Sequence, residues 1–92
     1  MKSYEVKYHK KAIKFMKKHK EYGLRFYKAF DELKENHPIN FNKYDIRKIQ
    51  GEKKKNLFRL RIGDYRALFE VKNDEINIIY VLLIDSRGDV YK

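Results

Sequence analysis

The sequence predicts an α+β fold with the element order βααβββ, in which a helical hairpin packs on one face of a mainly antiparallel four-stranded sheet. Apolar residues recur at helical spacing in the first half of the chain and in strand-like runs in the second half. Two short links, Gly63-Asp64 and Asn73-Asp74, separate the later strands and favour antiparallel hairpins. Segregated helices and strands predict helices on one side of a sheet. At 92 residues, the chain is expected to form a single domain spanning 1–92.

The first two predicted elements are a short strand and a basic helix. Residues 4–8 alternate polar and apolar side chains, which favours a strand. Residues 9–19 change to helical spacing, with Ala12, Ile13 and Met16 on one side. The remaining positions of this helix are mostly lysines, which we expect to form a solvated face: Lys10, Lys11, Lys14, Lys17 and Lys18.

The second predicted helix runs from about residue 24 to residue 35. Phe26, Phe30 and Leu33 recur at i, i+4 and i+7, which places them on one face. Pro38 ends the helical pattern, because a proline disfavours the helical conformation in the residue before it. We expect the two helices to share one apolar side.

The second half of the chain is predicted to hold a connector, three strands and a tail. Residues 39–55 form the connector, with Ile46 and Ile49 as packing residues and an exposed, lysine-rich end. The strands cover about residues 57–62, 65–72 and 76–83. The last of these is almost wholly apolar, as expected for a central strand covered on both faces. Residues 84–92 form a short polar tail.

Composition narrows the class of function. The chain has 23 Lys and Arg residues against 13 Asp and Glu, a formal net charge of +10, which favours a polyanionic partner. It has no cysteine, which excludes disulfides, zinc–thiolate sites and a cysteine nucleophile. No apolar run approaches the ~20 residues of a membrane helix, and the first residues lack the apolar core of a signal peptide. We therefore expect a cytoplasmic protein with no membrane partner.

Basic residues gather in the second half, where residues 43–66 contain nine basic and three acidic side chains. In the strand predicted at 57–62, alternation puts Arg59 and Arg61 on the face opposite the apolar side chains. Cations fixed on a rigid sheet suit a phosphate-rich partner better than a small apolar ligand. An ordinary solvent-facing strand surface is the alternative, and Arg66 could equally form a structural ion pair with Asp64 or Glu70.

Four motifs follow one another in a fixed order: Ile49-Gln50-Gly51, Phe58-Arg59-Leu60-Arg61, Gly63-Asp64-Tyr65-Arg66, and an arginine and a tyrosine four residues apart at Arg87 and Tyr91. In this order the chain resembles the RelE/ParE toxin superfamily of type II toxin–antitoxin modules. The resemblance covers nearly the whole chain, and the ordered set is more specific than any one motif.

The resemblance to RelE-type members implies a ribosome-dependent endoribonuclease (an mRNA interferase) that cuts mRNA in the ribosomal A site by 2′-hydroxyl attack, without a metal or other cofactor. Such a reaction needs a base, an acid and cations for the developing charge. Matching motif to motif gives this candidate catalytic set: Arg59, Arg61, Arg66, Arg87 and Tyr91. The nearby basic residues are candidates for RNA and ribosome binding: Arg47, Lys48, Lys53, Lys54 and Lys55. The implied partners are the ribosome, mRNA and an acidic RelB-like antitoxin. The toxin is expected to be a monomer when free and to form a hetero-oligomer with the antitoxin.

The chain also departs from the family pattern. Arginine at positions 59 and 61 keeps the charge of the lysines found in some relatives but cannot act as a general base. Ser86 stands where some relatives have a histidine, which leaves Tyr91 as the best proton acceptor. The ordinary pKa of a tyrosine, about 10, is too high for this role alone, and we expect neighbouring arginines to lower it by favouring the phenolate. Asp85 and Asp89 are the alternative bases. A ParE-like inhibitor of DNA gyrase and a non-enzymatic RNA-binding module are the alternative functions.

Overall fold

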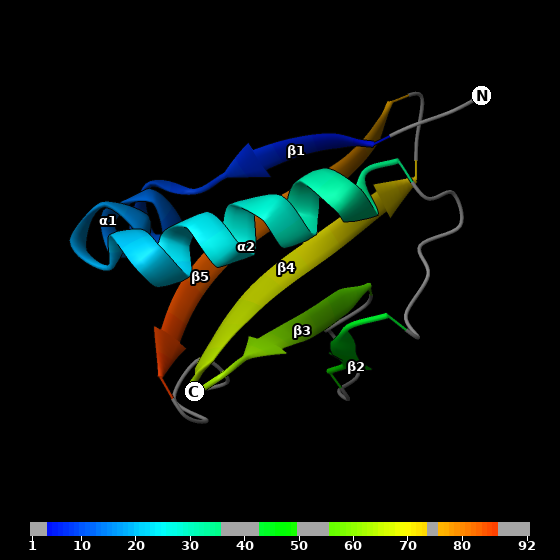
Figure 1. Ribbon diagram of the computed structural model, residues 1–92. Coiled ribbons are helices and arrows are strands. Elements are labelled where there is room, and N and C mark those ends of the chain that lie inside the picture. The colour runs from blue at the N-terminus through cyan, green and yellow to red at the C-terminus, as the bar shows by residue number, and fades with distance from the viewer. Residues whose placement is uncertain (1–3, 36–42, 50–55, 74–75, 87–92) are drawn as a thin grey trace.

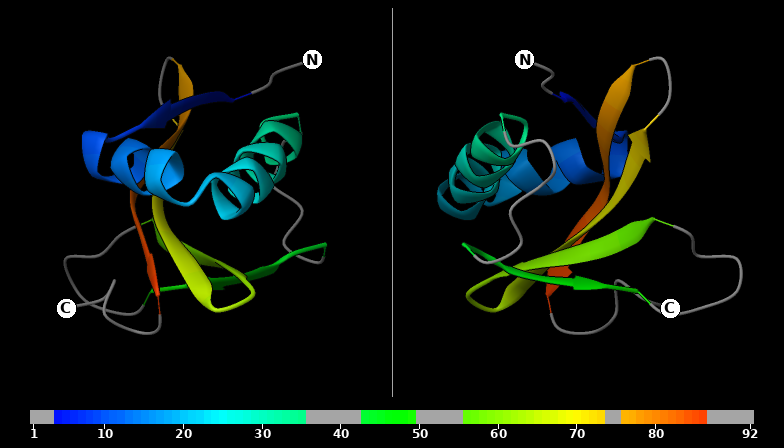
Figure 2. Two further views of the ribbon diagram at one scale, coloured as in Figure 1. Left: turned by 60° about the vertical axis from the view of Figure 1, so that its left-hand side comes forward. Right: turned by 90° about the vertical axis from the view of Figure 1, so that its right-hand side faces the viewer.

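The computed structural model describes residues 4–35, 43–49, 56–73 and 76–86, and Figure 1 shows their arrangement. The strands form one five-stranded sheet in the order β1-β5-β4-β3-β2, and both helices lie on the same face of it (Figures 1 and 2). The elements, in chain order, are β1 (Glu5–Tyr8), α1 (Lys10–Lys18), α2 (Lys20–Leu33), β2 (Asp45–Lys48), β3 (Leu57–Ile62), β4 (Tyr65–Asn73) and β5 (Asn77–Ser86).

The sheet is mixed but mainly antiparallel. The pairs β2–β3, β3–β4 and β4–β5 are antiparallel, and β1 pairs parallel with β5. The parallel pair joins the first and last strands of the chain, so β1 completes the sheet from the far end of the sequence. The predicted α+β class, with a helical hairpin on one face of a mainly antiparallel sheet, is confirmed.

The predicted number of four strands is wrong, because β2 adds a fifth strand within the segment expected to be a connector. β2 has four residues, of which Ile46 alone is apolar, and it lies at the edge of the sheet. So short a strand has no periodic signal of its own. Its pairing with β3, where Ile46 lies opposite the fully buried Leu60, is what makes it a strand.

The second helix begins at Lys20, four residues earlier than predicted, because Gly23 does not break it. Gly23, the fourth residue of the helix, is buried in its first turn, where α2 contacts α1. A Cβ atom at this position would lie 2.8 Å from both the Cα and the carbonyl oxygen of Met16. The glycine therefore allows two helix backbones to touch, which is a tertiary role that the local pattern does not reveal.

The core lies between the helices and the sheet. Phe26, Phe30 and Leu33 are buried as predicted, and the Phe30 ring meets Phe69 of β4 edge-on at 5.2 Å between centroids. Other members come from every strand of the sheet or its flanking residues. Helix α1 contributes less than predicted, because Ile13 is 40% exposed and Ala12 is its one buried residue. Its five lysines are exposed, as expected.

Strand β5 is an inner strand, but it is not covered on both faces as predicted. An irregularity in its pairing with β4 leaves Leu82 between two register positions, so that Ile79, Val81 and Ile84 are the residues that face the helices and are buried. Leu83 is half-buried on the opposite face, which neither α1 nor α2 covers. β5 also extends to Ser86 and so includes part of the predicted tail.

Candidate functional site

The face of the sheet opposite the helices carries a row of charged residues. Asp45 of β2, Arg61 of β3, Arg66 of β4 and Asp85 of β5 occupy one register position across four neighbouring strands. Since residues paired in register point to the same face, these side chains leave the sheet together. Two arginines therefore stand side by side, with a carboxylate on each flank.

The β3–β4 turn joins the strands that carry the two central arginines of this row and so sets their pairing. Gly63 of the turn has a φ of +60°, a left-handed conformation that glycine adopts without strain. Arg61 is exposed, and its Nε donates a hydrogen bond to the Gly63 carbonyl oxygen at 3.1 Å. A Cβ at Gly63 would lie 2.8 Å from the Tyr22 hydroxyl, so α2 packs directly on this turn. Tyr22 in turn packs on Tyr65, with their ring centroids 4.6 Å apart.

Arg66 is half-buried on the open face. In the part of the chain that the structure describes, it forms no ion pair with Asp64 or Glu70, the two structural partners considered from the sequence. Its charge is thus not committed to either of these carboxylates, and it lies opposite another arginine, Arg61. Two adjacent cations repel each other, and an anion between them relieves that repulsion.

Arg59 occupies the next register position on the same face, opposite Arg47 of β2 and Leu68 of β4. Its side chain is only 11% exposed, and its Nη1 lies 3.4 Å from Oδ1 of Asp45. Arg47 is far more exposed, and its Nε lies 3.9 Å from the same oxygen. Asp45 thus stands between two arginines. Sequence reasoning missed Asp45, because a single aspartate in an apparent connector carries no signal.

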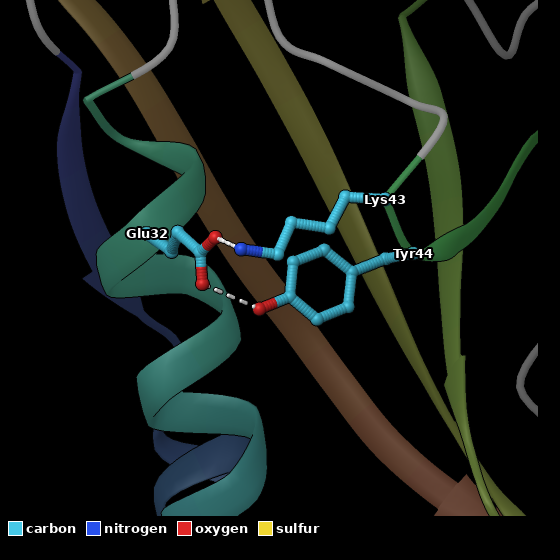
Figure 3. Close-up of polar contacts among 3 residues, drawn as sticks. All are labelled: Glu32, Lys43 and Tyr44. Atoms are coloured by element: carbon cyan, nitrogen blue, oxygen red, sulfur yellow. Dashed lines mark hydrogen bonds and ion pairs between the residues drawn. The ribbon is translucent and has the colours of Figure 1, made fainter.

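Residues before β2 are tied to helix α2 by a group of contacts that we call the Glu32 clamp (Glu32, Lys43 and Tyr44; Figure 3). The Glu32 carboxylate accepts a hydrogen bond from the Lys43 ammonium group and, through Oε2, another from the Tyr44 hydroxyl at 2.8 Å. The hydrogen bond from Lys43, and then that from Tyr44, lower the pKa of Glu32. Burial, followed by the bond to Glu32, raises the pKa of Tyr44. The clamp fixes the start of β2 against the helical layer.

Some of the remaining residues singled out from the sequence lie in the described part of the chain, and the others lie outside it. Lys48 lies opposite Phe58 and thus on the register positions of the helix-covered face, apart from the arginines. Ser86, opposite Tyr65, is the last residue of β5. The other predicted residues fall outside the described ranges: Lys53, Lys54, Lys55, Arg87, Asp89 and Tyr91. Within those ranges, His, Asp and Glu side chains form no group of three or more that could hold a metal ion. None of the described helices is long and apolar enough to cross a membrane.

Comparison with known proteins places the chain in a defined class. Residues 6–91 match the family model described as the ParE toxin of the type II toxin–antitoxin system parDE. A curated protein of Methanocaldococcus jannaschii named "Putative toxin RelE1" is 30% identical over 89 residues, which cover 97% of this chain and 96% of that protein. The chain thus belongs to the RelE/ParE toxins of type II toxin–antitoxin systems.

Solved structures share the fold. A chain in the crystal structure of the archaeal RelE–RelB complex from Pyrococcus horikoshii OT3 is 31% identical, with a TM-score of 0.72 over 94% of this chain and 97% of that chain. A chain of the RelBE2 toxin–antitoxin complex from Mycobacterium tuberculosis, 21% identical, has the same fold, with a TM-score of 0.57 over 92% of this chain and 99% of that chain.

Proposed function

We propose that this toxin is a ribosome-dependent, metal-independent endoribonuclease that cleaves mRNA in the ribosomal A site, and that it acts in the cytoplasm. The observation that carries the proposal is the pairing of Arg61 with Arg66 on the face of the sheet opposite the helices. Both are permanently charged, and neither is neutralised by a described ion pair. Such a pair is suited to a phosphate group.

The proposed reaction transfers the phosphate within the RNA chain. The 2′-hydroxyl gives its proton to a base and its oxygen attacks the adjacent phosphorus, and the bond to the 5′-oxygen breaks as that oxygen takes up a proton from an acid. A 2′,3′-cyclic phosphate and a 5′-hydroxyl result. Negative charge builds on the phosphate oxygens in the transition state, and fixed cations stabilise that charge with little reorganisation. Arg61 and Arg66 belong to adjacent strands joined by a short turn, so their spacing is set before RNA binds.

The other roles are assigned by the resemblance. Arg59, restrained by Asp45, supplies a third cation one register position away. Arg87 follows Ser86 directly in the sequence and would add a fourth cation. Tyr91 would accept the 2′-hydroxyl proton, as phenolate stabilised by the arginines. Arg47 and the lysines at 53–55 would contact RNA phosphates and steer association through charge, whereas Lys48 belongs to the register positions of the other face.

We also propose that the toxin is a monomer when free and binds a RelB-like antitoxin in a hetero-oligomeric complex. The support is the 31% identical chain, which was crystallised in a RelE–RelB complex and is covered over 97% of its length. A formal net charge of +10 favours an acidic partner or an acidic wrapping segment. Co-expression with the gene adjacent to that of the toxin should restore growth and yield a stable complex.

A second candidate function is inhibition of DNA gyrase without RNA cleavage, and the match to the ParE family model favours it. The two candidates differ in target. A ribonuclease should cut mRNA only on translating ribosomes, at positions that primer extension maps to the A site. A gyrase inhibitor should leave that mRNA intact and should block supercoiling of relaxed plasmid by purified gyrase.

Replacement of Arg66 with alanine tests the ribonuclease proposal. Loss of one cation that contacts the transition state should lower the single-turnover cleavage rate by about 10²–10³-fold. Arg25→Ala is a matched control, since Arg25 is an exposed arginine on α2 that pairs with Glu21 at 3.4 Å. It should keep the wild-type rate. Cleavage by Arg66→Ala at the wild-type rate would remove Arg66 from the mechanism.

A further inference from the structure

Arg59 has a different environment from the other two arginines of the site. Its side chain is only 11% exposed, and within the described residues its Nη1 has neither solvent contact nor a hydrogen-bond partner. Among the described residues, the carboxylate that forms an ion pair with it is that of Asp45, at 3.4 Å. A buried cation depends strongly on such a partner, because without it the charge is compensated neither by water nor by protein. Asp45 is therefore the described carboxylate that compensates the charge of Arg59.

Asp45 itself is placed by contacts that come from the helical layer. It is the first residue of β2, a four-residue edge strand that has one neighbouring strand. The two residues before it, Lys43 and Tyr44, are both held by Glu32 of α2 (Figure 3). The residue after it, Ile46, is buried in the core. The segment is therefore fixed on both sides of Asp45, and its carboxylate is directed to the open face.

We propose that Asp45 is a positioning residue for Arg59, and that the Glu32 clamp determines where Asp45 lies. The carboxylate restrains the guanidinium on the sheet, one register position from Arg61 and Arg66. Three cations then present a fixed arrangement to the RNA phosphate. The inference rests on the proposed ribonuclease function for its activity readout, and it extends the site to β2 and α2.

The alternative role for Asp45 is inhibitory: its carboxylate would occupy the place of an RNA phosphate and compete with that phosphate for Arg59. The two roles predict opposite signs for removal of the charge. Burial of Arg59 favours the positioning role. A buried guanidinium without a partner has a higher free energy than a hydrated one, so Arg59 would move into water if the Asp45 charge were removed.

The test is a double-mutant cycle between positions 45 and 59, measured as single-turnover cleavage at saturating programmed ribosomes. Asp45→Asn should lower the rate about tenfold with little change in ribosome affinity, and Asp45→Glu should recover at least half of the loss. In the Arg59→Ala background, Asp45→Asn should change the rate by less than twofold, because its effect passes through Arg59. Asp31→Asn is the matched control, since it breaks an exposed ion pair with Lys34 at 2.8 Å.

Three results would overturn the proposal. The first is cleavage by Asp45→Asn at the wild-type rate. The second is faster cleavage, as competition with phosphate predicts. The third is that Asp45→Asn lowers the cleavage rate as much in the Arg59→Ala background as in the wild-type background. If Asp45→Asn does not fold, Glu32→Gln and Tyr44→Phe decide the matter, since they leave both charges of the pair in place. Each should lower the rate about threefold in the wild-type background and not in Arg59→Ala. Wild-type rates in both variants would reject the role of the clamp.

A failure of the ribonuclease proposal gives a different pattern. The wild-type protein would then cut no mRNA on ribosomes, whatever the state of Asp45. The same cycle measured by urea unfolding still reports on the pair, and a coupling of at least about threefold in the unfolding equilibrium constant is expected between Asp45 and Arg59. Additive effects in that measurement would show that the two side chains act independently.

Discussion

Replacement of Gly23 with alanine tests whether the contact between the two helices depends on a missing side chain. The new Cβ would lie 2.8 Å from the Cα and from the carbonyl oxygen of Met16. Backbone atoms cannot rotate away as a flexible side chain can, so α1 and α2 must separate by several tenths of an ångström. Overpacking of this kind costs about 1–3 kcal/mol.

A second effect of the same substitution has the opposite sign. Alanine is about 1 kcal/mol better than glycine within a helix, since it loses less backbone entropy on folding. We expect the steric cost to exceed this gain, because two backbone atoms are affected at once and Gly23 is buried. The net effect of Gly23→Ala should therefore be to lower the free energy of unfolding by up to about 2 kcal/mol, which lowers the Tm by up to roughly 16 °C for a domain of this size.

Thermal and urea unfolding, followed by circular dichroism, measure this change. Lys28→Ala is a suitable control, since it places alanine at an exposed position of the same helix and should stay within about 0.5 kcal/mol of the wild-type protein. A Gly23→Ala protein that is more stable than wild type by about 1 kcal/mol would refute the reasoning. That result would mean that helix propensity alone governs the position and that the helices separate at no cost.

Three further predictions concern the site. Tyr91→Phe should fold and bind ribosomes normally but cleave about 10²–10⁴-fold more slowly in single-turnover assays, the span expected for a general acid–base group; a loss below about threefold would show that the hydroxyl is not the base. Neutralising Lys53, Lys54 and Lys55 together should flatten the slope of log K for ribosome binding against log salt concentration, because fewer counterions are released; an unchanged slope would remove these lysines from the interface. Hydrogen bonds from its two clamp partners lower the pKa of Glu32. The stability contributed by the clamp should therefore be complete above the ordinary pKa, near 4.5, and be lost as the pH falls through the lowered value. The difference in Tm between wild type and Glu32→Gln should shrink over that interval, and a difference that does not depend on pH would contradict this.

Much of the arginine site could be predicted from the second half of the sequence. Residues 57–62 were predicted as a strand with the bounds that β3 has, because apolar and basic side chains alternate along it without a break. That alternation also put Arg59 and Arg61 on the face away from the core. The Gly63-Asp64 link predicted a tight hairpin, and a hairpin of this length places Arg66 opposite Arg61. The strand, its two arginines and the hairpin could be predicted because each depends on residues that are close together in the sequence.

Other features depend on residues that are distant in the sequence. β2 is a strand because β3 is beside it, and the helical position of Gly23 follows from the approach of Met16. The irregularity at Leu82 appears only when β5 pairs with β4, and it changes which apolar residues of the strand are buried. In each case the local pattern is compatible with more than one structure, and the free energy of long-range packing selects among them.

By itself, the sequence determined the α+β class, the antiparallel hairpins, the buried face of α2 and the two cations that share a face of β3. These are properties of short segments, where side-chain periodicity directly matches backbone geometry. Tertiary structure alone decided that a fifth strand exists, that Asp45 on this strand pairs with Arg59, and that Glu32 holds the chain beside it. The sequence does not show which carboxylate pairs with which guanidinium, because an ion pair forms wherever folding brings opposite charges within a few ångströms of each other.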